Sequence, residues 1–156
     1  MPRTLRVGSV VNAAIDGLRA DAALVGLLNP GIAADQRVAK VYTNVPEHTI
    51  APYVHILSGA EQVWGQSMGD DTGAQCDLDV MVYSPHRGTR ELDAIANVVT
   101  QLVSTSYTWQ GVSGFAGYDW PDGDVSTKPI QEFIDGELLF RRTVRIRVFV
   151  NGAEPS

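Results

Sequence analysis

The sequence has little of several features that identify common protein classes. It contains one cysteine, Cys76, in 156 residues, which excludes an internal disulfide and a site built from several thiolates. No apolar run approaches the roughly 20 residues that a membrane-spanning helix needs. After a charged start, the first segment is interrupted by Asn12, Asp16 and Arg19, so it lacks the continuous apolar stretch of a secretory signal. We therefore expect a cytoplasmic protein, not a membrane protein, in which Cys76 is a core residue.

Basic residues are also scarce. Lys and Arg number 12 against 18 Asp and Glu, so the formal net charge is −6. The basic residues are concentrated only near the carboxyl end, where arginines alternate with apolar residues. A surface of this charge repels phosphate, which argues against tight binding of DNA or RNA. It is compatible with a surface past which DNA must slide.

Motifs of common catalytic and nucleotide-binding sites are missing. The sequence has no G-x-S-x-G elbow, no Walker-type loop and no G-x-G-x-x-G fingerprint. Its histidines, His48, His55 and His86, are dispersed and lack the H-E-x-x-H spacing that places two metal ligands on one helix face. We interpret them as isolated surface or packing residues, and we expect no cofactor.

Four aspartates are the remaining basis for an enzyme: Asp70, Asp71, Asp77 and Asp79. Carboxylates at alternate strand positions point the same way and could hold a divalent cation. No EF-hand loop accompanies them, and solvated acids beside a loop are the ordinary case. A metal-dependent enzyme is therefore the less favoured alternative, and we expect neither a metal site nor catalysis.

Two segments have the apolar spacing of amphipathic helices. The first begins near Ser9 and is followed by a short turn that Asp21 caps and residues 29–31 (NPG) end. The second begins at Thr89 and has one apolar stripe that needs a sheet to cover it. The stripes consist of Val10, Val11, Ala14, Ile15, Leu18 and Ala22, and of Leu92, Ile95, Ala96, Val99, Leu102 and Val103.

The strand signals lie between and after these helices. We expect short strands at residues 40–45 and 53–57, and an antiparallel return at residues 61–68 after a tight connection at Gly59-Ala60. Clean alternation predicts strands at residues 75–83 and 137–150, with Arg142 interrupting the apolar face of the last one. The pattern predicts one domain over residues 1–156, of class α+β, with a mostly antiparallel sheet and two main helices packed on one face.

The expected non-core face of this sheet is charged. Asp77 and Asp79 share it on one strand, and Arg145 and Arg147 lie opposite them if the two long strands pair. Two interpretations of this face are open: a solvated face with weak ion pairs, and a contact between subunits. The polar segment with Asp70 and Asp71 is expected to be an exposed loop.

The segment 107–124 is expected to be an irregular insert rich in glycine and aromatic residues. Such rings can anchor an interface, and they can equally fold back on the core, so composition leaves both alternatives open. The candidate contact residues are Trp109, Phe115, Tyr118 and Trp120.

The order of these pieces resembles the tail-terminator (tail-completion) proteins of long-tailed, non-contractile bacteriophages. The resemblance covers most of the chain and departs from the family pattern in the 107–124 insert and the extended final strand. It rests on residues 21–28 (DAALVGLL), 41–46 (VYTNVP), 51–56 (APYVHI) and 78–84 (LDVMVYS), followed by a helix with Gly88, Glu91, Ile95, Ala96, Val99 and Leu102.

The resemblance implies a structural virion protein that assembles in the host cytoplasm. Six copies would form a ring on the head-proximal end of the tail tube, in contact with the tail tube protein and with the head-completion (stopper) protein. DNA would pass through the ring without specific binding. We expect Asp77, Asp79, Arg145 and Arg147 to contribute to a subunit boundary, and Asp70 and Asp71 to face the lumen or a neighbouring ring. A head-closure or connector subunit of the neck is the main alternative.

Overall fold

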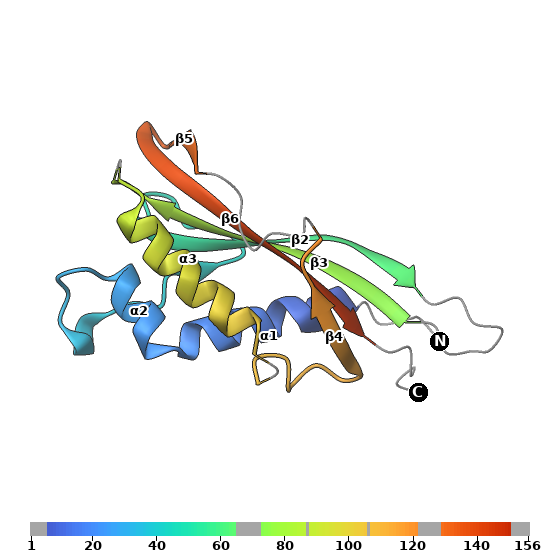
Figure 1. The fold of residues 1–156 in the computed structure, drawn as a ribbon. Helices are drawn as coiled ribbons and strands as arrows, with labels where there is room; N and C mark the ends of the chain where they lie inside the picture. Colours follow the sequence, from blue (N-terminus) through green and yellow to red (C-terminus); the bar gives the residue numbers. More distant parts are fainter. Residues whose placement is uncertain (1–5, 65–72, 87, 106, 122–128, 151–156) are drawn as a thin grey trace.

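The computed structural model describes residues 6–64, 73–86, 88–105, 107–121 and 129–150. Within these ranges the chain forms an α+β fold in which one sheet is covered by helices on one face (Figure 1). The fold class is therefore confirmed. The acidic residues Asp70 and Asp71 lie outside the described residues.

The described strands form one six-stranded sheet with the order β1-β2-β3-β6-β4, and β5 pairs with the opposite end of β6 from β4. All pairs are antiparallel except β1 with β2. The two longest ladders join β3 to β2 and to β6, so β3 and β6 are the central strands. The strands are β1 (Val41–Tyr42), β2 (Tyr53–Trp64), β3 (Gly73–Ser84), β4 (Phe115–Asp119), β5 (Ile130–Ile134) and β6 (Glu137–Val150).

The strand β2 corrects one sequence prediction. Residues 53–57 and 61–68 were expected to be two strands joined by a tight turn at Gly59-Ala60, but residues 53–64 form one strand that pairs with β3 along its length. The register shifts between Ser58 and Glu61, so the glycine marks a β-bulge and not a reversal. The predicted first strand is also shorter, because only Val41 and Tyr42 pair with β2.

Three helices form the second layer of the described structure: α1 (Arg6–Ala20), α2 (Ala22–Leu28) and α3 (Arg90–Val103). The Asp21 side chain caps α2, because its Oδ2 accepts a hydrogen bond from the Leu24 amide at 2.9 Å. The apolar stripes of α1 and α3 pack against the inner face of β2, β3 and β6, as their periodicity predicted. Ala22, which was predicted to extend the first stripe, is instead the exposed first residue of α2. At that interface Arg142, which interrupts the apolar face of β6, pairs with Asp93 of α3 at 2.9 Å.

The segment between α3 and β5 is more ordered than the sequence predicted. Its residues 115–119 form β4, which pairs with the carboxyl-terminal end of β6. Trp109 is fully buried in the main core, and its Nε1 donates a hydrogen bond to the carbonyl of Val103 at 2.9 Å. The prediction of an irregular insert over residues 107–124 is therefore wrong for β4, and folding back on the core is the correct alternative for Trp109.

The β5–β6 hairpin is a further element that the sequence reading missed. Its turn residues, Asp135 and Gly136, have φ angles of 52° and 79°. Positive φ at both positions is the requirement of a type I′ turn, for which Asp-Gly is a favoured pair. The hairpin carries Phe133, which is 75% exposed.

A small second cluster lies on the sheet face away from the helices. Tyr53 and Tyr83 stack with ring centroids 4.9 Å apart, and Ala51, Met81 and Leu139 are buried beside them. Burial raises the pKa of Tyr53 to about 12, and the neighbouring Tyr83 adds to the rise. The outer face is therefore apolar at the β5 end and charged nearer to β4.

The burial of Trp109 gives a direct stability test. Replacing Trp109 by Ala should lower the free energy of unfolding by about 3–5 kcal/mol, because a large cavity and an unpaired Val103 carbonyl remain. The matched control is Tyr107→Ala, which removes an aromatic ring that is 78% exposed and should change this free energy by about 0.5 kcal/mol or less. Urea unfolding monitored by circular dichroism measures both. Equal effects of the two substitutions would show that Trp109 is not a core residue.

The raised pKa of Tyr53 gives a pH test. The folded state favours the neutral hydroxyl, so this contribution to stability is complete below the unfolded pKa of 10.0 and is lost as the pH rises towards about 12. Tyr53→Phe cannot ionise and should flatten the decline in unfolding free energy over that interval. The measurement is urea unfolding at a series of alkaline pH values, and identical declines for parent and Tyr53→Phe would contradict the assignment.

Candidate functional site

The outer sheet face brings together the four charged residues that the sequence singled out. In the β3–β6 register, Asp77 lies opposite Arg147 and Asp79 lies opposite Arg145. The Arg145 guanidinium contacts both carboxylate oxygens of Asp79, with Nε–Oδ1 at 2.7 Å and Nη2–Oδ2 at 3.3 Å. The Arg147 Nε donates to Asp77 Oδ1 at 2.9 Å. The predicted pairing is confirmed, and we call these four residues the charged quartet.

The charged quartet has a modest effect on stability and a clear effect on surface charge. All four side chains are partly exposed, so each pair contributes only about 0.2–1 kcal/mol. Two arginines neutralise two aspartates within one chain, which leaves this part of the face without a strong net charge. Because each carboxylate is held by an arginine, it is poorly placed to bind a divalent cation. Among the described residues, no group of three or more potential metal ligands occurs.

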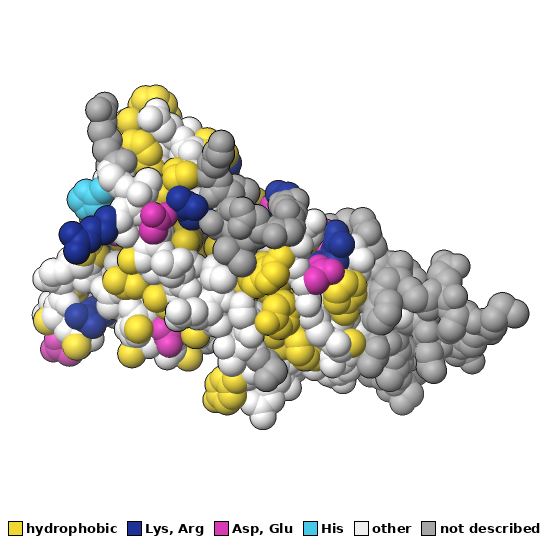
Figure 2. Space-filling model, in the orientation of Figure 1, with side chains coloured by type: hydrophobic (Ala, Val, Ile, Leu, Met, Phe, Trp, Pro, Cys, Tyr) yellow, Lys and Arg dark blue, Asp and Glu magenta, His cyan; other side chains and the backbone are white. Residues whose placement is uncertain are grey.

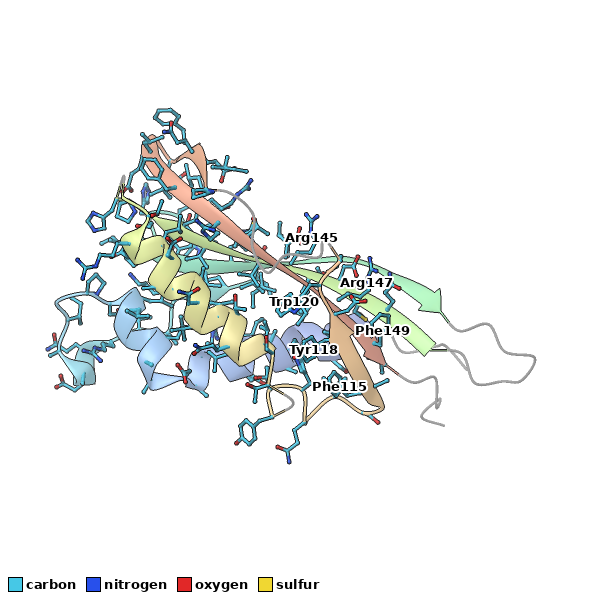
Figure 3. All side chains as sticks on the ribbon, viewed as in Figure 1. Phe115, Tyr118, Trp120, Arg145, Arg147 and Phe149 are labelled. Atoms are coloured by element: carbon cyan, nitrogen blue, oxygen red, sulfur yellow. The ribbon has the colours of Figure 1, made fainter. Side chains whose placement is uncertain are left out.

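The position of the quartet in the sheet limits what it can contact. It lies on β3 and β6, the two central strands, and lines a depression of about 390 Å³ together with Gly59 and Pro121. Figure 3 shows Arg145 and Arg147 along β6, beside β4. The quartet therefore faces away from the helices in the middle of the sheet. Its role in a subunit boundary stays a prediction.

The aromatic residues of the insert fix β4 to the core. The Tyr118 hydroxyl donates to the carbonyl of Ser104, just after α3, at 3.0 Å. Tyr118 and Trp120 meet edge to face at 5.8 Å, and Phe115 stacks with Trp109 at 6.3 Å. Phe115, Tyr118 and Trp120 are half-buried against the core, whereas Trp109 has no exposed surface for a partner. Contact by the three half-buried rings stays a prediction.

A second hollow lies on the outer face at the opposite end of the sheet. It measures about 590 Å³, and its wall is the loop 44–50 together with residues from β2, β3, β6 and the β5–β6 turn. His48 and His55 both line it, although the sequence gave no reason to bring them together. The His55 Nε2 lies 3.0 Å from the carbonyl of Thr43, while His86 lies beside Glu91 near α3. The hollow combines Tyr53 and Tyr83 with Glu47 and Glu137.

Exposed apolar side chains also occur on the sheet, at the β5–β6 hairpin and on β2. Figure 2 shows hydrophobic side chains at the end of the molecule that carries the β5–β6 hairpin, where Phe133 is located. Leu57, which is 45% exposed, lies on β2 just past the end of β1. These positions, with the charged quartet, make the sheet and its rims the candidate surfaces for contact with other chains.

The two rims of the sheet are open over part of their length. On one side, β1 pairs only with Val54 and His55, so no described strand covers residues 57–64 of β2. On the other side, β6 is the one described strand with which β4 and β5 pair. Sequence reasoning missed this feature, because it divided β2 in two and did not predict β4.

No helix in the described part of the chain has the length and apolar content needed to span a membrane. No curated protein matches the sequence. The fold is similar to that of a chain in a solved structure described as the virion of a native gene transfer agent (GTA) particle. The TM-score is 0.57, the sequences are 22% identical, and the similarity covers 90% of this chain and 93% of the other.

Family comparison gives the more specific result. The sequence matches the profile of the family described as tail completion protein gp17 over residues 13–151. The match begins within α1 and extends through β6, so it includes both the helical layer and every strand of the described sheet. The chain therefore belongs to the tail completion protein gp17 family.

Proposed function

We propose that copies of this chain form a ring that caps the head-proximal end of a tail tube, stops the tube from growing and presents a joining surface to the head. The observation that carries the proposal is the family match over residues 13–151. The family has a structural role in phage tails and is not a family of enzymes. Ring formation, the end of the tube that is capped and the partners are the parts that we propose.

The physical basis of capping is asymmetry between two surfaces. A tube grows because each ring of subunits offers an end that the next ring can bind, which is a head-to-tail series with no natural limit. A subunit that binds this end on one side, and offers a different surface on the other, stops the series. The fold supports this role because the two ends of the sheet differ. One end carries β1 and the β5–β6 hairpin with the exposed Phe133, and the other end carries β4.

We infer the partners from the same role. Six copies would build the ring, the tail tube protein would contact one side, and the head-completion protein would contact the other. DNA would pass through the centre without specific binding, which the net charge of −6 supports because it offers phosphate no lasting contact. The finished ring would belong to the virion after assembly in the host cytoplasm.

The pairing within the charged quartet weakens the alternative of a metal-dependent enzyme. Asp77 and Asp79 would have to leave Arg147 and Arg145 before they could bind a cation. Calorimetric titration with Mg²⁺ or Mn²⁺ should therefore give no binding heat that depends on these two aspartates. The parent and the Asp77→Asn and Asp79→Asn variants should give the same titration curve. A neck connector remains the competing structural role.

Tail length separates a tube cap from a neck connector. Particles assembled without this chain should have tails that exceed the normal length, because nothing ends tube growth, and supplying the chain in trans should restore a single length. Electron micrographs of both preparations provide the measurement. Tails of normal length that are not joined to heads would instead indicate a connector and would contradict the capping role.

The same distinction can be made with purified components. Adding the chain to tail tube protein at the start of polymerisation should shorten the tubes in proportion to the amount added, and adding it afterwards should leave the existing length unchanged. Heat-unfolded chain at the same concentration is the control. Tubes of equal length with and without folded chain would exclude direct capping.

A further inference from the structure

We propose that neighbouring copies join through their sheet edges, with residues 57–64 of β2 in one copy pairing with β4 in the next. The ring would then contain one continuous sheet. This inference rests on the proposed function for the existence of a ring, and it adds the surface by which the ring closes. It follows from the order, direction and relative level of the strands.

The first observation is that both edges are available. Beyond Val54 and His55, β2 has no described neighbour on the side away from β3, and β4 has none on the side away from β6. An open edge presents a row of backbone N–H and C=O groups that pair readily with another strand. The two edges lie on opposite sides of the subunit, as a head-to-tail ring requires.

The second observation concerns strand direction. β2 is antiparallel to β3, β3 is antiparallel to β6, and β6 is antiparallel to β4. β2 and β4 therefore run in opposite directions within one copy. Rotation about an axis that runs along the strands preserves these directions, so β2 would meet the β4 of its neighbour as an antiparallel pair. That pairing is slightly more stable per residue than the parallel one.

The third observation is that the two open edges lie at the same level. Tyr118 of β4 pairs with Val148 of β6, Val148 pairs with Cys76 of β3, and Cys76 pairs with Glu61 of β2. Tyr118 and Glu61 therefore lie at the same height along the sheet. A closed ring has no rise from copy to copy, so the edges that meet must lie at matching heights. At the other end of the sheet β2 is covered by β1, and the open length of β2 is thus the part that faces a neighbouring β4.

The resulting dimensions suit a tail. At the level of the junction each copy contributes four strands, β2, β3, β6 and β4, which span about 19 Å at ~4.8 Å per strand. Six copies give a circumference of about 115 Å and a backbone radius of about 18 Å. This radius exceeds that of a DNA duplex. The helices, each roughly 10–12 Å thick, must then lie on the outside, because they would fill the channel if they lay within it.

This arrangement gives the charged quartet a different place from the one predicted. With the helices outside, the bare sheet face lines the channel, so the paired charges of Asp77, Asp79, Arg145 and Arg147 face the passing DNA. Neutralised pairs neither hold phosphate strongly nor repel it strongly. The subunit boundary lies instead at β2 and β4.

Bulges in both edge strands restrict which strand of another copy can pair with them. β2 has a bulge between Ser58 and Glu61, and β4 has one between Phe115 and Gly117. Bulges increase local twist and oppose unselective edge-to-edge association, so they favour a partner of matching twist. Leu57 adds exposed apolar surface at the β2 edge, on the outer face.

Cysteine cross-linking tests the junction. Cα atoms in antiparallel pairs are about 4.5–5.5 Å apart, which suits a disulfide. In a Cys76→Ala background, Asp119→Cys on β4 is combined in turn with Leu57→Cys, Ser58→Cys, Gly59→Cys, Glu61→Cys or Gln62→Cys on β2. Scanning is needed because a tilt of the strands to the axis shifts the register. At least one pair should give covalent oligomers up to the full ring on mild oxidation, whereas each single-cysteine variant should stop at the dimer or below.

Two non-covalent variants complete the test. Leu57→Arg should reduce the fraction of protein in rings at least tenfold while its circular dichroism stays that of the parent. The matched control exchanges one ion pair, Asp79→Arg with Arg145→Asp, and should leave ring formation unchanged. Two outcomes would overturn the edge junction. In the first, rings form but no scanned cysteine pair cross-links them. In the second, the charge exchange abolishes the rings while Leu57→Arg leaves them intact. A parent protein that forms no ring, alone or with tail tubes, would remove the proposed function and the junction with it.

Discussion

The antiparallel ladder between β3 and β6 is the constraint on which the rest of the structure depends. It runs from Ala74 opposite Val150 to Ser84 opposite Phe140, so the two longest alternating patterns of the chain face each other. A slip of one residue would move the buried valines to the outer face and bring Arg145 and Arg147 into the core. The pairing of Arg142 with Asp93 links the same register to α3. Core, charged quartet and helix packing therefore share one alignment.

Sequence patterns predicted the elements in which a regular apolar period coincides with clear signals at both ends. α3 and β3 have both the periodicity and clear ends, and the opposition of Asp79 and Arg145 followed once the long strands were paired. β2 was divided because Gly59 reads as a turn when it stands between two apolar runs, although in the fold it lies in a bulge. β4 and β5 are short edge strands without clean alternation, and only the Asp135-Gly136 pair gave a local signal for the hairpin. Trp109 could not be assigned, since buried and exposed rings look alike in composition.

The candidate site was predictable in part for a related reason. A contact within the chain is encoded by patterns on both partner segments, so the ion pairs of the quartet could be anticipated from alternation alone. A contact with another copy depends on which rims stay open, and that is a property of the strand order. Among the described strands, the order β1-β2-β3-β6-β4 leaves residues 57–64 of β2 and all of β4 at the rims. No local pattern in either segment contains this information.

Open edges are ordinarily a liability, because they invite association without limit. A closed ring reduces that liability, since the open part of every β2 would pair with a neighbouring β4 and only the short strands β1 and β5 would keep an open edge. Closure of the ring also affects how growth of the tail tube ends. Once the lateral edges are satisfied within one ring, further contacts are confined to its two ends, where the β1 and β5 side of the sheet differs from the β4 side. A ring whose two ends are chemically unlike can bind a tube at one of them without offering the same surface again, which is the condition for ending a polymer.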